Sequence, residues 1–113
     1  MSKPSRKKSS PPLRVRTDGV AAMVESIVGC KWSLIVLELA RQGVNRPGAM
    51  ERAVPGLTAK VLNERLRKMI RFGIFERRVF PVIPPHVEYR FTPFGRKFLR
   101  LLRAIERLQR GLR

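Results

Sequence analysis

A run of Thr, Lys, Asn and Arg residues in the middle of the chain has the side chains that read and hold nucleic acid. Placed at about 100° per residue, residues 58–72 form a helix with two distinct faces. One face carries Lys60, Asn63, Arg67 and Arg71, and the opposite face carries Leu62, Leu66 and Met69. An Asn side chain pairs bidentately with adenine, and Lys pairs with the O6 and N7 atoms of guanine. The pattern therefore favours a helix that lies against DNA.

Position along this helix separates two kinds of contact. Residues near the start of a recognition helix reach base edges, so the candidate base-reading residues are Thr58, Lys60 and Asn63. Arg67 and Arg71 lie further along, where guanidinium groups hold backbone phosphates. The alternative is an ordinary core helix whose charged face is merely solvated. The hairpin that follows and the net charge favour DNA.

The residues after this helix predict a β-hairpin. Thr58 is a predicted N-cap and Gly73 a helix stop, and two strand-like segments, 74–80 and 87–91, then flank a proline-rich tip. A capped basic helix that leads into a hairpin is the order of a winged helix-turn-helix, in which the hairpin, or wing, lies along the DNA backbone. The predicted backbone contacts of the wing are Arg77, Arg78, His86 and Arg90.

The remaining elements complete a fold that is α+β and mainly helical. Three helices are predicted before the Pro55-Gly56 turn, over residues 20–28, 31–42 and 47–54, the first with Asp18 as its N-cap. A last helix begins at Thr92-Pro93. Its apolar stripe is more than one small domain can bury, so we expect a C-terminal dimerisation helix. The predicted interface residues are Phe98, Leu102, Ile105 and Leu108.

The charge of the chain indicates a polyanionic partner. The 113 residues include 25 Lys and Arg against 8 Asp and Glu, a formal net charge of +17. Such an excess repels itself in a compact fold unless a polyanion is bound, and double-stranded DNA is the expected partner. Residues 1–17 hold basic but no acidic side chains and are predicted to be a disordered basic arm before a domain at 18–113.

The sequence lacks the residues that metal binding, catalysis or membrane insertion would need. One Cys and one His provide no ligand set for a metal, and there is no glycine-rich phosphate loop or Ser/His/Asp set, so we expect neither a cofactor nor an enzyme. No apolar run approaches the ~18 residues of a membrane span, and no signal-peptide core follows the basic N-terminus. The prediction is a cytoplasmic protein with no membrane partner.

Three further residues receive structural predictions. Arg65 falls within the apolar arc of the basic helix, where a guanidinium needs a carboxylate, and Glu88 or Glu51 is the expected partner. Tyr89 alternates with charged residues and is expected in the core. Cys30 precedes a strongly apolar helix and is expected to be packed rather than reactive.

Five short motifs resemble the HxlR-type branch of the MarR-like winged-helix transcription regulators. They are Ile27-Val-Gly-Cys-Lys-Trp32, Val54-Pro-Gly-Leu-Thr58, Val61-Leu-Asn-Glu-Arg-Leu66, Pro84-Pro-His-Val-Glu-Tyr89 and Thr92-Pro-Phe-Gly95. The resemblance implies a homodimer, joined mainly through the first and last helices, that reads a roughly palindromic operator. Many members carry a redox-sensing Cys before the first helix; Gly19 stands there in this chain, so thiol sensing of that kind is expected to be lost. The sequence does not identify a small-molecule effector.

Two functions therefore compete. The first is a sequence-specific transcription regulator, and the second is an architectural, chromatin-like DNA binder, which the large charge and the basic arm would also suit. Only the first should prefer one sequence by the ~10³-fold or more that is usual for regulators.

Overall fold

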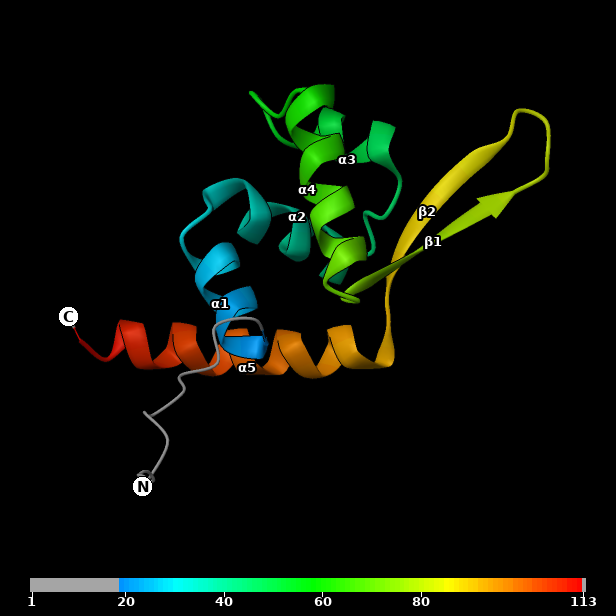
Figure 1. The fold of residues 1–113 in the computed structure, drawn as a ribbon. Helices are drawn as coiled ribbons and strands as arrows, with labels where there is room; N and C mark the ends of the chain where they lie inside the picture. Colours follow the sequence, from blue (N-terminus) through cyan, green and yellow to red (C-terminus); the bar gives the residue numbers. More distant parts are fainter. Residues whose placement is uncertain (1–18, 113) are drawn as a thin grey trace, which may run out of the picture.

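The computed structural model describes residues 19–112, and it confirms a mainly helical winged helix-turn-helix (Figure 1). In chain order the elements are α1 (Val20–Val28), α2 (Lys31–Arg41), α3 (Pro47–Ala53), α4 (Ala59–Arg71), β1 (Phe75–Phe80), β2 (His86–Phe91) and α5 (Pro93–Arg110). The predicted basic arm, residues 1–17, lies outside the described residues. Gly19 takes the N-cap position of α1; Asp18, the residue expected there, is also outside them.

Threonine side chains cap the first turns of α4 and α5 and so fix where these two helices begin. The Thr58 hydroxyl oxygen accepts a hydrogen bond from the Val61 backbone N–H at 3.2 Å, and the Thr92 hydroxyl accepts one from Gly95 at 2.8 Å. Both contacts confirm that these helices begin where the sequence predicts. Gly73 has a φ of 73°, a conformation that suits glycine, and this turns the chain from α4 directly into β1.

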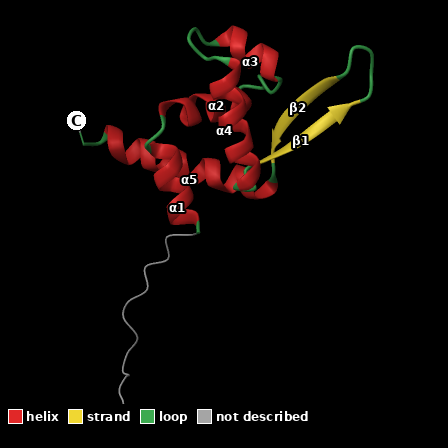
Figure 2. Ribbon diagram, turned by 45° about the horizontal axis from the view of Figure 1, so that its top comes forward, coloured by secondary structure: helices red, strands yellow, loops and turns green. Residues whose placement is uncertain are grey.

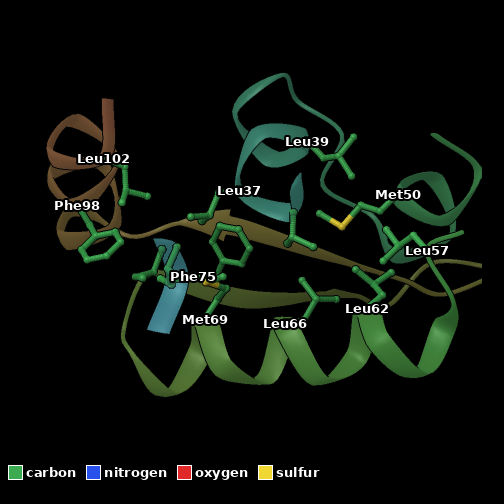
Figure 3. Close-up of a cluster of buried hydrophobic side chains, with 13 residues drawn as sticks. Leu37, Leu39, Met50, Leu57, Leu62, Leu66, Met69, Phe75, Phe98 and Leu102 are labelled. Carbon is green, nitrogen blue, oxygen red and sulfur yellow. The ribbon is translucent and has the colours of Figure 1, made fainter. Parts of the chain in front are cut away.

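The apolar face of α4 forms one wall of the hydrophobic core. Leu62, Leu66 and Met69 are buried, as predicted, and Figure 3 shows them facing Phe75 of β1 and residues of the other helices. The polar face of α4 is left outside. Burial of this single stripe therefore fixes which side chains of the helix a ligand can reach.

The wing is a two-stranded antiparallel hairpin that projects away from the helices (Figure 2). Directly paired residues lie on the same face of such a hairpin, and the register pairs Arg77 with Tyr89 and Arg78 with Glu88. Arg77 and Arg78 consequently point to opposite sides of the wing. The sequence pattern predicts the same role for both, and this geometry separates them.

Helix α5 packs closely on the start of the wing, and this corrects part of the predicted dimer interface. A β-carbon on Gly95 would collide with the Ile74 carbonyl oxygen, so glycine permits the approach. Phe98 and Leu102 are then buried in the core of their own protomer, at 2% and 4% exposed. The prediction that these two side chains form an interface is wrong, because the apolar residues of α5 cover more than one face. Ile105 is half-buried, and Leu108 is 74% exposed.

Within residues 19–112, no single helix is long and apolar enough to cross a bilayer; α1 and α2 reach that length and composition only when they are counted together across a 100° bend.

Candidate nucleic-acid interface

The exposed face of α4 presents the predicted nucleic-acid-binding residues in one row. Lys60, Asn63, Arg67 and Arg71 are all exposed. Thr58 is exposed too, but its hydroxyl oxygen already accepts the N-cap hydrogen bond, which leaves the hydroxyl proton to donate elsewhere. The row therefore places an amide and an ammonium near the start of the helix and two guanidinium groups further along it.

A cleft between α4 and the wing brings three of the predicted backbone-contacting residues together. It has a volume of about 490 Å³ and is lined by Arg67, Ile70, Arg71, Arg77 and Tyr89. Tyr89 is half-buried against the core, as expected, and its backbone N–H donates to the Asn45 carbonyl at 2.8 Å, which ties β2 to the segment before α3. Two elements thus supply guanidinium groups to one concave surface that suits a sugar–phosphate backbone.

The other three predicted backbone contacts lie on the opposite face of the wing and have carboxylate partners. Glu76 lies 3.3 Å from the Arg78 guanidinium, and Glu88 lies 2.6 Å from that of Arg90. The His86 Nε2 atom is 3.5 Å from Glu88. The hydrogen bond from Arg90 is the main cause that holds the pKa of Glu88 below its usual range. Compensated charges attract phosphates less strongly, so the α4 side of the wing is the more cationic one.

A third face of α4 fixes the helix to the corner between α1 and α2. The Arg65 Nε donates to the Cys30 Sγ at 3.2 Å, and the Lys68 Nζ donates to the Ser26 carbonyl at 3.2 Å. The expected partners of Arg65, Glu88 and Glu51, are wrong: its nearest carboxylate is that of Glu64, at 3.6 Å. Glu88 is occupied by the wing residues instead. The structural role predicted for Arg65 nevertheless fits this contact.

Cys30 is less buried than the packed thiol that the sequence predicts, and its reactivity stays a prediction. It is half-buried at the N-cap position of α2. Burial by itself raises the pKa of the thiol, but the side chain and backbone N–H of Ser33 and the Arg65 guanidinium stabilise the thiolate more, and they lower the pKa to about 7. A large fraction of Cys30 is therefore ionised at neutral pH.

Two arginines that the sequence pattern does not single out also approach the wing. Arg46 and Arg52, together with Pro85, His86 and Val87, line a second cleft, of about 370 Å³, between α3 and the start of β2. The only sequence signal for these two arginines is that they are cationic and lie shortly before the Pro55-Gly56 turn. Among residues 19–112, no group of three His, Cys, Asp or Glu side chains is placed to hold a metal ion.

A basic helix that follows a tight turn, with a wing beside it, defines the winged helix-turn-helix class of DNA-binding domains. The chain matches the model of the HxlR-like helix-turn-helix family over residues 27–111, which is most of its length. It belongs to that family of helix-turn-helix proteins.

Individual relatives agree with this assignment. An HTH-type transcriptional regulator of Synechocystis sp. is 40% identical over 85 residues, which cover 75% of this chain and 63% of the relative. The match to the YtfH regulator of Escherichia coli, 35% identical over 60% of this chain, covers 54% of that protein. The chain thus spans less than two thirds of the length of these curated relatives.

Solved structures extend the likeness to the whole fold. A MarR-family protein of Enterococcus faecalis V583 superposes with a TM-score of 0.74 at 30% identity, over 96% of this chain and 94% of that one. The reduced form of the regulator YodB from B. subtilis superposes with a TM-score of 0.67 at 25% identity, over 75% and 83% of the two chains.

Proposed function

We propose that the protein is a sequence-specific regulator that binds double-stranded DNA as a homodimer. Helix α4 enters the major groove, where Thr58, Lys60 and Asn63 meet base edges. Arg67, Arg71 and Arg77 hold the phosphates on the side where the wing approaches α4. The observation that carries the proposal is the cleft in which guanidinium groups of α4 and β1 converge next to the exposed amide and ammonium.

Dimerisation is supported by a stripe of large apolar side chains on the outer face of α5. Leu101 and Leu108 of α5 are 40% and 74% exposed and lie seven residues apart, and Leu112, just after the end of the helix, is 83% exposed. Helix α1 lies beside α5 in both ribbon views, and its Val20 is also exposed (Figures 1 and 2). A second copy of the chain would cover this surface and remove these side chains from water.

The arm at residues 1–17 adds a sequence-independent contact in this proposal. Its basic side chains follow phosphates next to the folded domain and raise affinity for any duplex. The binding takes place in the cytoplasm, needs no cofactor and includes no catalytic step.

Selection of bound fragments from a random duplex pool tests the proposal. We expect enrichment of one roughly palindromic sequence, with half-sites spaced by about 10–10.5 base pairs or a multiple, because a two-fold dimer presents its two α4 helices to one face of the duplex. Binding to the enriched sequence should exceed binding to random duplex by about 10³-fold or more. A pool that stays unenriched while the protein binds tightly would contradict the proposal and favour the architectural alternative.

A further inference from the structure

Helix α5 carries a row of arginines that the proposed function does not use. The members of this arginine row are Arg96, Arg100, Arg103, Arg107 and Arg110. All five side chains are exposed. Neighbouring members lie alternately four and three positions apart, so they share one face of the helix. At 1.5 Å per residue, the arginine row extends for about 21 Å along α5.

The arginine row differs from an ordinary solvated helix face. Exposed faces commonly mix charges of both signs, and opposite charges three or four positions apart support the helix. Among the 18 residues of α5, six are cationic and only Glu106 is acidic. Like charges at these spacings repel one another and weaken the helix. An anionic partner that neutralises the arginine row would remove this repulsion, so the row indicates a binding surface.

Neighbouring elements do not neutralise the arginine row. The Glu38 carboxylate of α2 accepts hydrogen bonds from Arg41 on its own helix. The hydrogen bond from Arg41 is the main cause that lowers the pKa of the Glu38 carboxyl to about 2, and the charge of Arg103 contributes least. Arg96 donates to the Phe91 carbonyl at 3.3 Å, which is a neutral acceptor. In the part of the chain that the structure describes, no arginine of the row forms an ion pair.

The arginine row faces away from the surfaces that the proposed function occupies. At 100° per residue, it is centred about 130° around the helix from Leu101 and Leu108, the exposed leucines that a second copy of the chain would cover. Figure 1 shows α5 at the end of the molecule where α4 finishes, across the domain from the start of α4. A second copy on the leucines and a duplex on the start of α4 would both leave the arginine row exposed.

The chemistry of the arginine row fits a sugar–phosphate backbone. Guanidinium groups bind phosphate oxygens bidentately, and a row of five suits a polymer of phosphates better than a single small anion. Binding to an anionic membrane would need large apolar side chains that enter the lipid beside the cations, and the exposed leucines of α5 lie on a different face.

We propose that the arginine row binds the backbone of a second DNA duplex, so that a protein bound to DNA through α4 holds two duplexes together. The second contact is independent of sequence, because it is made to phosphates alone. This inference rests on DNA binding through α4, which is part of the proposed function, and not on the recognition of one preferred sequence.

Capture of a second duplex tests this inference. The duplex enriched by selection, or a random duplex if none is enriched, is fixed on beads and saturated with the full chain. A fluorescent duplex of unrelated sequence is then added over a range of salt concentrations. The wild type should retain it, and Arg100→Gln/Arg107→Gln should weaken its retention by about tenfold or more and reduce its salt slope by about two. The affinity of this variant for the first duplex should stay that of the wild type.

Two control variants match this change in position and in charge. Arg100→Lys/Arg107→Lys keeps both charges on the arginine row and should retain most of the second duplex. Lys31→Gln/Lys97→Gln removes the same number of charges from exposed positions outside the row, and it should retain the second duplex as the wild type does. Because all four side chains are exposed, thermal unfolding should show no loss of stability in any of these variants.

Each of the other outcomes overturns the inference. If the wild type retains no second duplex, or if Arg100→Gln/Arg107→Gln retains it equally well, the arginine row does not bind DNA. If this variant loses affinity for the first duplex to the same degree, the row contacts that duplex and there is no second site. If vesicles of phosphatidylserine and phosphatidylcholine are retained through the row and a duplex is not, the row is a membrane surface. A protein that binds no duplex at all overturns the proposed function as well.

Discussion

The Nε atom of Arg65 donates a hydrogen bond to the Sγ atom of Cys30 at 3.2 Å, and this contact connects the recognition helix to the corner between α1 and α2. The two residues are 35 positions apart in the sequence. One turn further along α4, Lys68 makes a second contact with the same corner. The orientation of α4 over the core is thus fixed by polar contacts on its flank as well as by its apolar stripe.

Titration of the single cysteine should report this contact. With its pKa lowered from 9.0 to about 7, the folded thiol should show a thiolate absorbance midpoint near pH 7, and the unfolded thiol a midpoint near pH 9. Arg65→Leu should move the folded midpoint upward, because it removes both the hydrogen bond and the charge. Arg71→Leu, which removes one charge from an exposed position of the same helix, should leave it almost unchanged. Equal shifts in both variants would contradict a specific Arg65 contact.

The same shift sets the sign of a pH effect on stability. A depressed folded-state pKa means that the thiolate contributes stability above the unfolded-state pKa of 9.0, and that this contribution is lost as the pH falls through about 7. Urea unfolding of the wild type should therefore show a gain between pH 7 and pH 9 that is absent in Cys30→Ala.

Gly95→Ala should destabilise the domain by about 1–3 kcal/mol, because the new methyl group would meet the Ile74 carbonyl where α5 packs on the wing. Gly48 is a matched control, since it also lies near a proline at the start of a helix, but the nearest atom to its added methyl is the flexible end of Arg52 at 3.4 Å. Gly48→Ala should be neutral or stabilising by up to about 1 kcal/mol. Denaturant unfolding measures both; a Gly95→Ala protein as stable as the wild type would disprove the close approach.

Leu108→Glu should convert a dimer to monomers in sedimentation experiments and weaken operator binding, because it places a charge in the exposed stripe of α5. The corresponding change at Leu102 would unfold the protomer, since that side chain belongs to its own core. Ile83→Glu is the control for adding a charge at an exposed apolar site, and it should stay dimeric. A wild-type protein that sediments as a monomer at micromolar concentration would contradict the dimer.

Removal of residues 1–17 should flatten the salt dependence of DNA binding without changing the preferred sequence. Each phosphate that the arm no longer neutralises should reduce the slope of log affinity against log salt by about 0.9. Measurement of both quantities with the selected operator and with random duplex tests this. If the truncated protein fails to discriminate between the two duplexes, the arm takes part in reading the sequence.

The sequence predicted most element boundaries because short-range signals set them. Thr58 and Thr92 carry hydroxyls that cap helices, and Gly73 permits the turn after α4. The predicted partner of Arg65 was wrong because long-range contacts depend on how the helices cross. The face of the wing on which Arg77 lies follows from strand alternation, but which face borders α4 depends on packing. Likewise, the apolar residues of α5 did not indicate which of them the protomer buries.

The most direct test of sequence reading by α4 compares Asn63→Ala with Arg77→Ala on the selected operator and on random duplex, over a range of salt concentrations. Asn63→Ala should cost about 1–3 kcal/mol on the operator and little on random duplex, because it removes a base contact. Arg77→Ala should weaken both about equally and reduce the salt slope by about one. Arg78→Ala, which removes a charge already paired with Glu76, should have a smaller effect than Arg77→Ala. If Asn63→Ala lowers the affinity for both duplexes equally, helix α4 does not read the sequence, and the central claim is wrong.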